Sequence, residues 1–271
     1  MLNQARSEFY LCLARAFLAP VTPASFTAMR EHLAADLEDL GATLGYPIAA
    51  PLRSYREAMA ALPDQEHLLV TYSRLFLVPA SALPAINAAT YLDGTLNGGS
   101  VAALEDLYRR CGLAPDRACL HDLPDHVSVQ LELVAYLYAA AATRDSGEET
   151  PELPVSAEDF LGSYVSRWAP GLHADLARAT GRLGVGANPY LPLAAVLEAA
   201  VTAETGLAEW PNDPASTGRP SEGPRPGRAA LGLSEADLEI IRQRLRAYGL
   251  SADHVMLPPG EGEAEAIRGR H

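Results

Sequence analysis

Apolar side chains recur along most of the chain at the three- and four-residue spacing of an amphipathic α-helix. The first stripe covers residues 9–17 and stops before Pro20. Thr22 is a favourable N-cap for a second helix with Pro23 in its first turn, and Gly41 offers the left-handed conformation that commonly ends a helix. The pattern therefore predicts two helices whose ends are set by local capping chemistry.

Apolar stripes of the same spacing continue through most of the remaining sequence. Helical stripes with recognisable ends predict further helices over residues 52–59, 64–76, 100–112, 125–143, 156–168, 171–181, 188–201 and 234–248. The segment 125–143 is the most apolar of them, which favours a central position. No alternating strand pattern of useful length occurs. We therefore predict an all-α fold, a single large helical domain of about ten helices.

Three segments interrupt the helical pattern. Residues 78–99 hold prolines and a turn-like Leu92-Asp93-Gly94, which favours a long ordered loop, and residues 144–154 favour an exposed connection. Five prolines lie between Trp210 and Gly232. We therefore divide the chain into a helical domain over 1–205, a Pro/Gly-rich linker over 206–233, and a C-terminal helix with a flexible tail over 234–271.

Composition narrows the functional classes. The chain has 271 residues, of which 48% are hydrophobic, and it carries 34 acidic against 21 basic residues for a formal charge of −13. The net negative charge disfavours nucleic acid as a partner, because its phosphate backbone is also negative. An acidic surface can attract a basic peptide, or it can simply keep the protein soluble. Three cysteines fit reduced thiols better than a disulfide framework. Because no signal core or membrane span is evident, we expect a cytoplasmic protein.

Motifs for nucleotide or hydrolytic chemistry are missing from the sequence. There is no phosphate loop, no nucleophile elbow and no zinc-binding HExxH pair. Cys111, Cys119, His121 and Asp122 are close in sequence but lack the paired spacing of structural zinc sites, and Cys111 lies on the apolar face of its helix. We therefore expect neither a cofactor nor an enzymatic activity.

Asp125-His126 is the most suggestive polar pair, because it lies at the start of the most apolar helix. One interpretation is helix capping, in which Asp125 accepts the free backbone N–H groups of the first turn. A catalytic interpretation needs a nucleophile or a third partner, and none is identifiable. From residue types alone, capping is the simpler interpretation.

Several segments, taken in order, resemble one known protein family. They are Tyr72-Ser73-Arg74-Leu75-Phe76 with Pro79, Tyr91-Leu92-Asp93-Gly94, residues 107–113, Leu123-Pro124-Asp125-His126 with Leu131-Glu132-Leu133, and residues 160–168 and 188–197. In this order and spacing they resemble the TorD/DmsD/NarJ family of cytoplasmic molybdoenzyme maturation chaperones. The resemblance covers roughly residues 5–205.

The resemblance implies a function and a site. A member of this family binds the N-terminal leader of a molybdoenzyme catalytic subunit, often a twin-arginine signal, and holds the subunit for insertion of the molybdenum cofactor before assembly or export. The family motif carries a peptide-binding role to Asp125 and His126. Neighbouring peptide-binding candidates are Tyr72, Phe76, Pro84 and Tyr91.

This sequence departs from the family pattern in two regions. After Pro84 it has Ala85-Ile86-Asn87 where an aromatic residue often stands, and the region beyond Trp210 has no counterpart. Two alternative functions stay open: a metal-dependent helical hydrolase using His121, Asp122, Asp125 and His126, and an adaptor that acts through its C-terminal helix. A monomer and a domain-swapped dimer are both compatible with long loops between helix groups.

Overall fold

The computed structural model describes residues 1–77, 84–114, 123–147, 149, 151–183 and 186–206. Within these ranges the regular secondary structure is helical, and the β-like pairing is limited to an isolated bridge between Asn87 and His126. The all-α prediction is therefore confirmed. The predicted linker and C-terminal helix lie outside the described residues. No helix in the described ranges is long and apolar enough to cross a membrane.

In the described residues the α-helices follow one another along the chain, with two π-helical turns between them. They are α1 (Leu2–Ala16), α2 (Pro23–Thr27), α3 (Leu33–Leu44), α4 (Ala49–Ala60), α5 (Gln65–Phe76), α6 (Ala89–Leu92), α7 (Gly99–Arg110), α8 (Val127–Asp145), α9 (Ala157–Phe160), α10 (Ser166–Leu183) and α11 (Tyr190–Thr205), and the π-helical turns are Ala28–His32 and Leu161–Val165.

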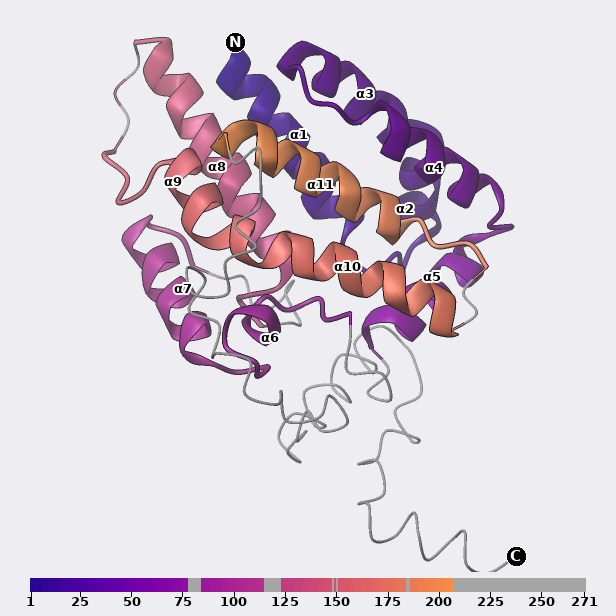
Figure 1. Cartoon of the computed structure of the whole chain (residues 1–271). Helices are drawn as coiled ribbons and strands as arrows, with labels where there is room; N and C mark the ends of the chain where they lie inside the picture. Colours follow the sequence, from indigo (N-terminus) through magenta and orange to yellow (C-terminus); the bar gives the residue numbers. More distant parts are fainter. Residues whose placement is uncertain (78–83, 115–122, 148, 150, 184–185, 207–271) are drawn as a thin grey trace, which may run out of the picture.

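Buried apolar side chains from most of these helices form one core. Helix α1 packs along α8 and against α3, while α10 and α11 run antiparallel across the bundle and α11 also packs on α4 (Figure 1). Trp168 and Tyr10 are fully buried in this core. Helix α10 contacts α5, α6 and α11, so it connects helices from the first and the last parts of the chain.

A buried carboxylate fixes the end of α11 to the bundle. Glu204 Oε1 lies 2.7 Å from Arg6 Nε and accepts a hydrogen bond from the Tyr46 hydroxyl, and Glu204 Oε2 accepts another from Tyr138 at 3.2 Å. The carboxylate side chain is only 6% exposed. Charge-assisted hydrogen bonds of this kind are among the stronger polar contacts in proteins, so the last turn of α11 is held in place.

The N-terminal cap of the second predicted helix is confirmed, but its predicted end at Gly41 is wrong. Thr22 accepts a hydrogen bond from the backbone N–H of Ser25, as the sequence predicts. The helical segment runs on to Gly45, whose φ of 73° is the left-handed conformation. Gly41 instead permits a close approach, because a Cβ there would lie 2.4 Å from the side chain of Ile48.

A second correction concerns α10. The predicted break between helices at residues 168–171 is absent, because Pro170 and Gly171 both lie inside α10. The helix buries Trp168 and Leu172 completely on its inner face, and this burial offsets the local cost of Pro170 and Gly171, which is about 3 and about 1 kcal/mol in a helix interior. Gly171 faces the ring of Tyr91, where a Cβ would come within 2.8 Å of Cδ1.

The start of α7 and the predicted long loop also differ in detail. Ser100 is not the N-cap, because α7 begins at Gly99 with Gly98 as its cap. The Ser100 backbone N–H and hydroxyl both donate to Asp93 Oδ2, at 2.9 and 2.6 Å. Within the predicted loop, residues 78–83 lie outside the described residues, and residues 89–92 form the short helix α6.

Candidate functional site

The carboxylate of Asp125 joins the start of α8 to the loop before α6. Its Oδ1 accepts a hydrogen bond from Asn87 Nδ2 at 3.0 Å, and its Oδ2 accepts one from the Ala89 backbone N–H at 2.8 Å. The Asp125 carbonyl oxygen also accepts the Ala88 N–H at 3.1 Å. Asp125 is 0% exposed, so these contacts replace water around a buried polar group. We call Asp125, Asn87 and Ala89 the clasp.

The helix cap at this position comes from His126 and not from Asp125. The Ser128 backbone N–H donates to His126 Nδ1 at 3.1 Å, which makes His126 the N-cap of α8. The capping interpretation of Asp125 is therefore wrong for α8, because His126 is the N-cap, whereas the two Asp125 oxygens accept hydrogen bonds from Asn87 and Ala89. His126 is 1% exposed, and its isolated bridge to Asn87 runs alongside the clasp.

Two further buried hydrogen bonds tie the clasp to the surrounding helices. Gln130 Nε2 donates to the Asp125 carbonyl oxygen at 2.9 Å, while Gln130 Oε1 accepts from Trp168 Nε1 at 2.9 Å. The Tyr108 hydroxyl donates to the Pro124 carbonyl oxygen at 2.8 Å, and burial raises the pKa of that hydroxyl well above its ordinary value. The clasp thus connects α7, α8 and α10.

Pro84 and Tyr91, two more of the predicted site residues, belong to the same region. Pro84 is buried, and the Ala85 backbone N–H donates to the Tyr91 hydroxyl at 3.0 Å. The ring of Tyr91 lies against Gly171 of α10. The structure therefore brings Asp125, Pro84 and Tyr91 into one loop-centred group.

Tyr72 and Phe76 lie in a different place, on the inner face of α5. Their rings are 5.0 Å apart between centroids, and Tyr190 at the start of α11 lies 5.5 Å from the first and 5.4 Å from the second. Tyr72 is 1% exposed and Phe76 is 9% exposed. The six predicted residues therefore form two groups, and both groups lie on elements that pack against α10.

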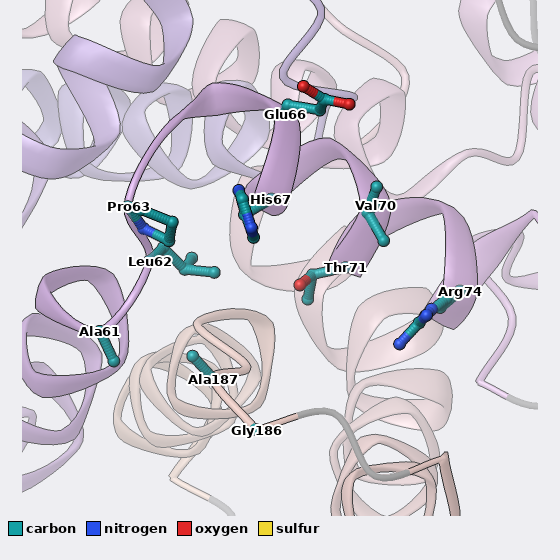
Figure 2. A pocket seen from close by; sticks show the side chains of 10 residues that line it. All are labelled: Ala61, Leu62, Pro63, Glu66, His67, Val70, Thr71, Arg74, Gly186 and Ala187. Atoms are coloured by element: carbon teal, nitrogen blue, oxygen red, sulfur yellow. The ribbon is translucent and has the colours of Figure 1, made fainter.

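A cleft of about 500 Å³ lies between α5, the end of α4 and the connection into α11. Figure 2 shows His67, Thr71 and Arg74 pointing from α5 toward Gly186 and Ala187. The remaining lining residues are Ala61, Leu62, Pro63, Glu66 and Val70. Val70 is 45% exposed, so it offers apolar surface at this cleft. We call this feature the α5 cleft.

Much of the helical bundle described above matches a known protein family. Residues 29–174, just over half of the chain, match the family model described as nitrate reductase delta subunit. The chain belongs to this family. It is a family of molybdoenzyme maturation chaperones, so the predicted TorD/DmsD/NarJ membership is confirmed. No curated protein and no solved structure matches the chain.

The match places the clasp within the part of the chain that is common to the nitrate reductase delta subunit family. Asn87, Ala89 and Asp125 all fall inside residues 29–174, as does the α5 side of the cleft. Gly186 and Ala187 fall beyond it, as do α11 and Glu204. The far wall of the cleft therefore comes from sequence outside the family match.

Charge in the α5 cleft is distributed along the helix. Asp64, the N-cap of α5, lies 2.7 Å from His67 Nδ1, and this hydrogen bond lowers the pKa of the Asp64 carboxyl. Glu66 follows in the same turn, while Arg74 lies two turns further on. Figure 2 shows Glu66 turned away from Ala187, at the rim. The cleft lining thus has the carboxylate of Glu66 toward the start of α5, the cation of Arg74 toward its end, and Val70 between them.

Sequence reasoning missed this cleft. Val70 and Arg74 fall outside the apolar stripe of α5, so the pattern indicated only that they face outward. The available signal was a large aliphatic residue at an outward position of an amphipathic helix. The opposing wall, at Ala187, is more than a hundred residues away in the sequence, and no local pattern relates the two.

The described residues contain no group of three or more His, Cys, Asp or Glu side chains suited to hold a metal ion. Cys111 is buried as predicted, and burial raises the pKa of its thiol. Three of the other metal candidates, Cys119, His121 and Asp122, lie outside the described residues. Asp125 and His126 are engaged in the clasp and the helix cap, so no observation favours the hydrolase alternative.

Proposed function

We propose that this protein binds the N-terminal leader of a molybdoenzyme catalytic subunit and holds that subunit while the molybdenum cofactor is inserted, before assembly or export. The family description points to a nitrate reductase-type subunit as the client. The single observation that carries the proposal is the α5 cleft, in a chain of this chaperone family.

The shape of the α5 cleft suits an amphipathic helix better than a small molecule. It is lined along one side by α5, with apolar side chains from Leu62, Val70 and Ala187 and with the charged residues Glu66 and Arg74 on α5. Peptides bind such clefts by placing their apolar face against the wall, as in other helix-in-groove complexes. Arginines of a leader would meet Glu66 through charge-assisted hydrogen bonds.

The six residues carried over from the family keep a proposed role in peptide binding, and their burial limits what that role is. Tyr72 and Phe76 act indirectly, because they pack α5, one wall of the α5 cleft, against Tyr190. Asp125, with His126, Pro84 and Tyr91, holds the loop before α6. A direct contact between Asp125 and a peptide requires that loop to open, since the carboxylate is 0% exposed.

The test is the affinity of the full chain for a labelled peptide that copies the client's N-terminus, measured by fluorescence anisotropy. Val70→Glu places a charge in the middle of the apolar wall, and we expect binding to weaken at least about tenfold, the equivalent of about 1.4 kcal/mol. Glu66→Lys is expected to weaken binding of an arginine-containing leader and to reduce the dependence of its affinity on salt.

Leu2→Glu is the matched control. Leu2 is 53% exposed at the start of α1, at the far end of the bundle from α5 (Figure 1). The Leu2→Glu substitution adds the same charge at a similarly exposed aliphatic position, so the affinity for the peptide should stay unchanged. If neither Val70→Glu nor Glu66→Lys changed the affinity for the peptide, the α5 cleft would not be the peptide-binding site and the proposal would be contradicted.

A further inference from the structure

Helix α11 carries few polar side chains on any of its faces. Only two of its residues, Glu198 and Glu204, are charged. Glu204 is turned into the bundle toward Arg6, and Glu198 Oε2 lies 2.5 Å from His173 Nδ1 on α10. A helix on the surface of a protein usually presents charged residues to water, whereas a helix that is apolar all round is covered on every side.

The outer face of α11 nevertheless stays open in the described part of the chain. Its residues, together with the connection between α3 and α4, line a shallow groove of about 360 Å³. The groove residues are Pro47, Ala195, Glu198, Ala199, Thr202 and Ala203. Ala203 is exposed, and the others on α11 are partly exposed. We call this feature the α11 groove.

The chain carries a segment whose chemistry complements this groove. The sequence predicts a helix over residues 234–248, with the apolar stripe Leu238, Ile241, Leu245 and Tyr248. Large side chains on such a stripe need an apolar surface to cover them, and alanines opposite them allow a close approach. Arg242 and Arg244 flank the stripe on its two sides, and the Glu198 carboxylate at the edge of the groove is 34% exposed.

The connection between the two is long enough. Helix α11 ends at Thr205, and residues 207–233 separate it from the predicted helix. A random coil of this length has a root-mean-square span of about 30 Å, whereas the whole groove lies within about 17 Å of Gly206 along the helix. Such a tether gives an effective local concentration in the millimolar range, so a weak contact is sufficient.

We propose that residues 234–248 dock as a helix in the α11 groove, so that the C-terminal region of the chain covers its own last core helix. This surface is separate from the α5 cleft, and the proposal holds whether or not the α5 cleft binds a leader.

The test uses a thiol placed in the groove by Ala203→Cys in the full chain, with maleimide labelling followed by mass spectrometry at that site. If the segment docks with an affinity of about 0.1 mM at a local concentration of about 1 mM, labelling is slowed about tenfold. Adding Leu245→Glu, which charges the stripe, should restore the fast rate. Gln243→Glu adds the same charge on the opposite face of the predicted helix and should leave labelling slow.

Three outcomes would overturn the proposal. The first is equal labelling with and without Leu245→Glu. The second is an increase in the rate on dilution of the protein, which identifies a second copy of the chain as the occupant. The third is a rate as fast as that of Ala24→Cys, an exposed position on α2. As an independent measurement, hydrogen exchange in residues 234–248 of the natural sequence should be slow and should accelerate in Ala199→Glu.

Discussion

Replacing Asp125 with alanine removes the acceptor of two buried hydrogen bonds at once. The Asn87 amide and the Ala89 backbone N–H, now 3.0 and 2.8 Å from the carboxylate, would lose that acceptor in a region where Asp125 itself is 0% exposed. Each buried donor left without a partner costs about 1–3 kcal/mol. The folded state also no longer has to bury a carboxylate, which offsets part of this cost.

The net loss expected for Asp125→Ala is about 3 kcal/mol of unfolding free energy. For a domain of this size, that corresponds to a fall in melting temperature of about 6–12 °C. Urea denaturation followed by circular dichroism measures the free energy directly. Glu57→Ala is the matched control, because Glu57 is exposed on α4, and a change within about 0.5 kcal/mol is expected there.

Hydrogen exchange localises the effect of Asp125→Ala. The Ala89 amide donates to the Asp125 side chain, whereas the neighbouring Ala88 amide donates to the Asp125 backbone carbonyl, which the substitution keeps. The Ala89 amide should therefore gain more in exchange rate than the Ala88 amide. A stability within 1 kcal/mol of the natural protein, or equal acceleration at both amides, would refute the clasp as a source of stability.

Two further predictions follow from packing and burial. Gly171→Ala should destabilise the protein by about 1–3 kcal/mol in urea denaturation, because the added Cβ would lie 2.8 Å from the Tyr91 ring. Gly181→Ala in the same helix meets nothing within 4 Å and should stabilise the protein by up to about 1 kcal/mol. Equal effects of the two substitutions would contradict the packing of Gly171 against Tyr91. Because burial raises the pKa of the Cys111 thiol, site-resolved alkylation at Cys111 should continue to rise with pH above about 8.5, and a profile centred on that ordinary value would contradict its burial.

The features that were predictable from sequence are those with local causes. Thr22 and Ser156 each accept a hydrogen bond from the backbone N–H three residues later, and Asp64 does the same for His67. Such caps depend on residues within one helical turn, so a single segment of sequence contains all the information that sets them. The amphipathic stripes are equally local, and they gave the fold class correctly.

The features that were missed depend on distant parts of the chain. Asp125 was expected to cap its own helix, but its partners Asn87 and Ala89 lie 38 and 36 residues earlier in the sequence. The sequence pattern places helix ends at Gly41 and Gly171. In the structure these glycines instead leave room for the side chains of Ile48 and Tyr91, respectively. Polar and small residues offer several local interpretations, and only tertiary packing selects among them.

The central claim, maturation of a molybdoenzyme client, is tested most directly by the metal content of that client. The nitrate reductase-type catalytic subunit is coexpressed with the natural chain, with Val70→Glu, with Leu2→Glu or alone, and its bound molybdenum is measured after purification. We predict near-complete loading with the natural chain and with Leu2→Glu, and severalfold lower loading with Val70→Glu or with no chain. Full loading of the client in the absence of this protein would contradict the account.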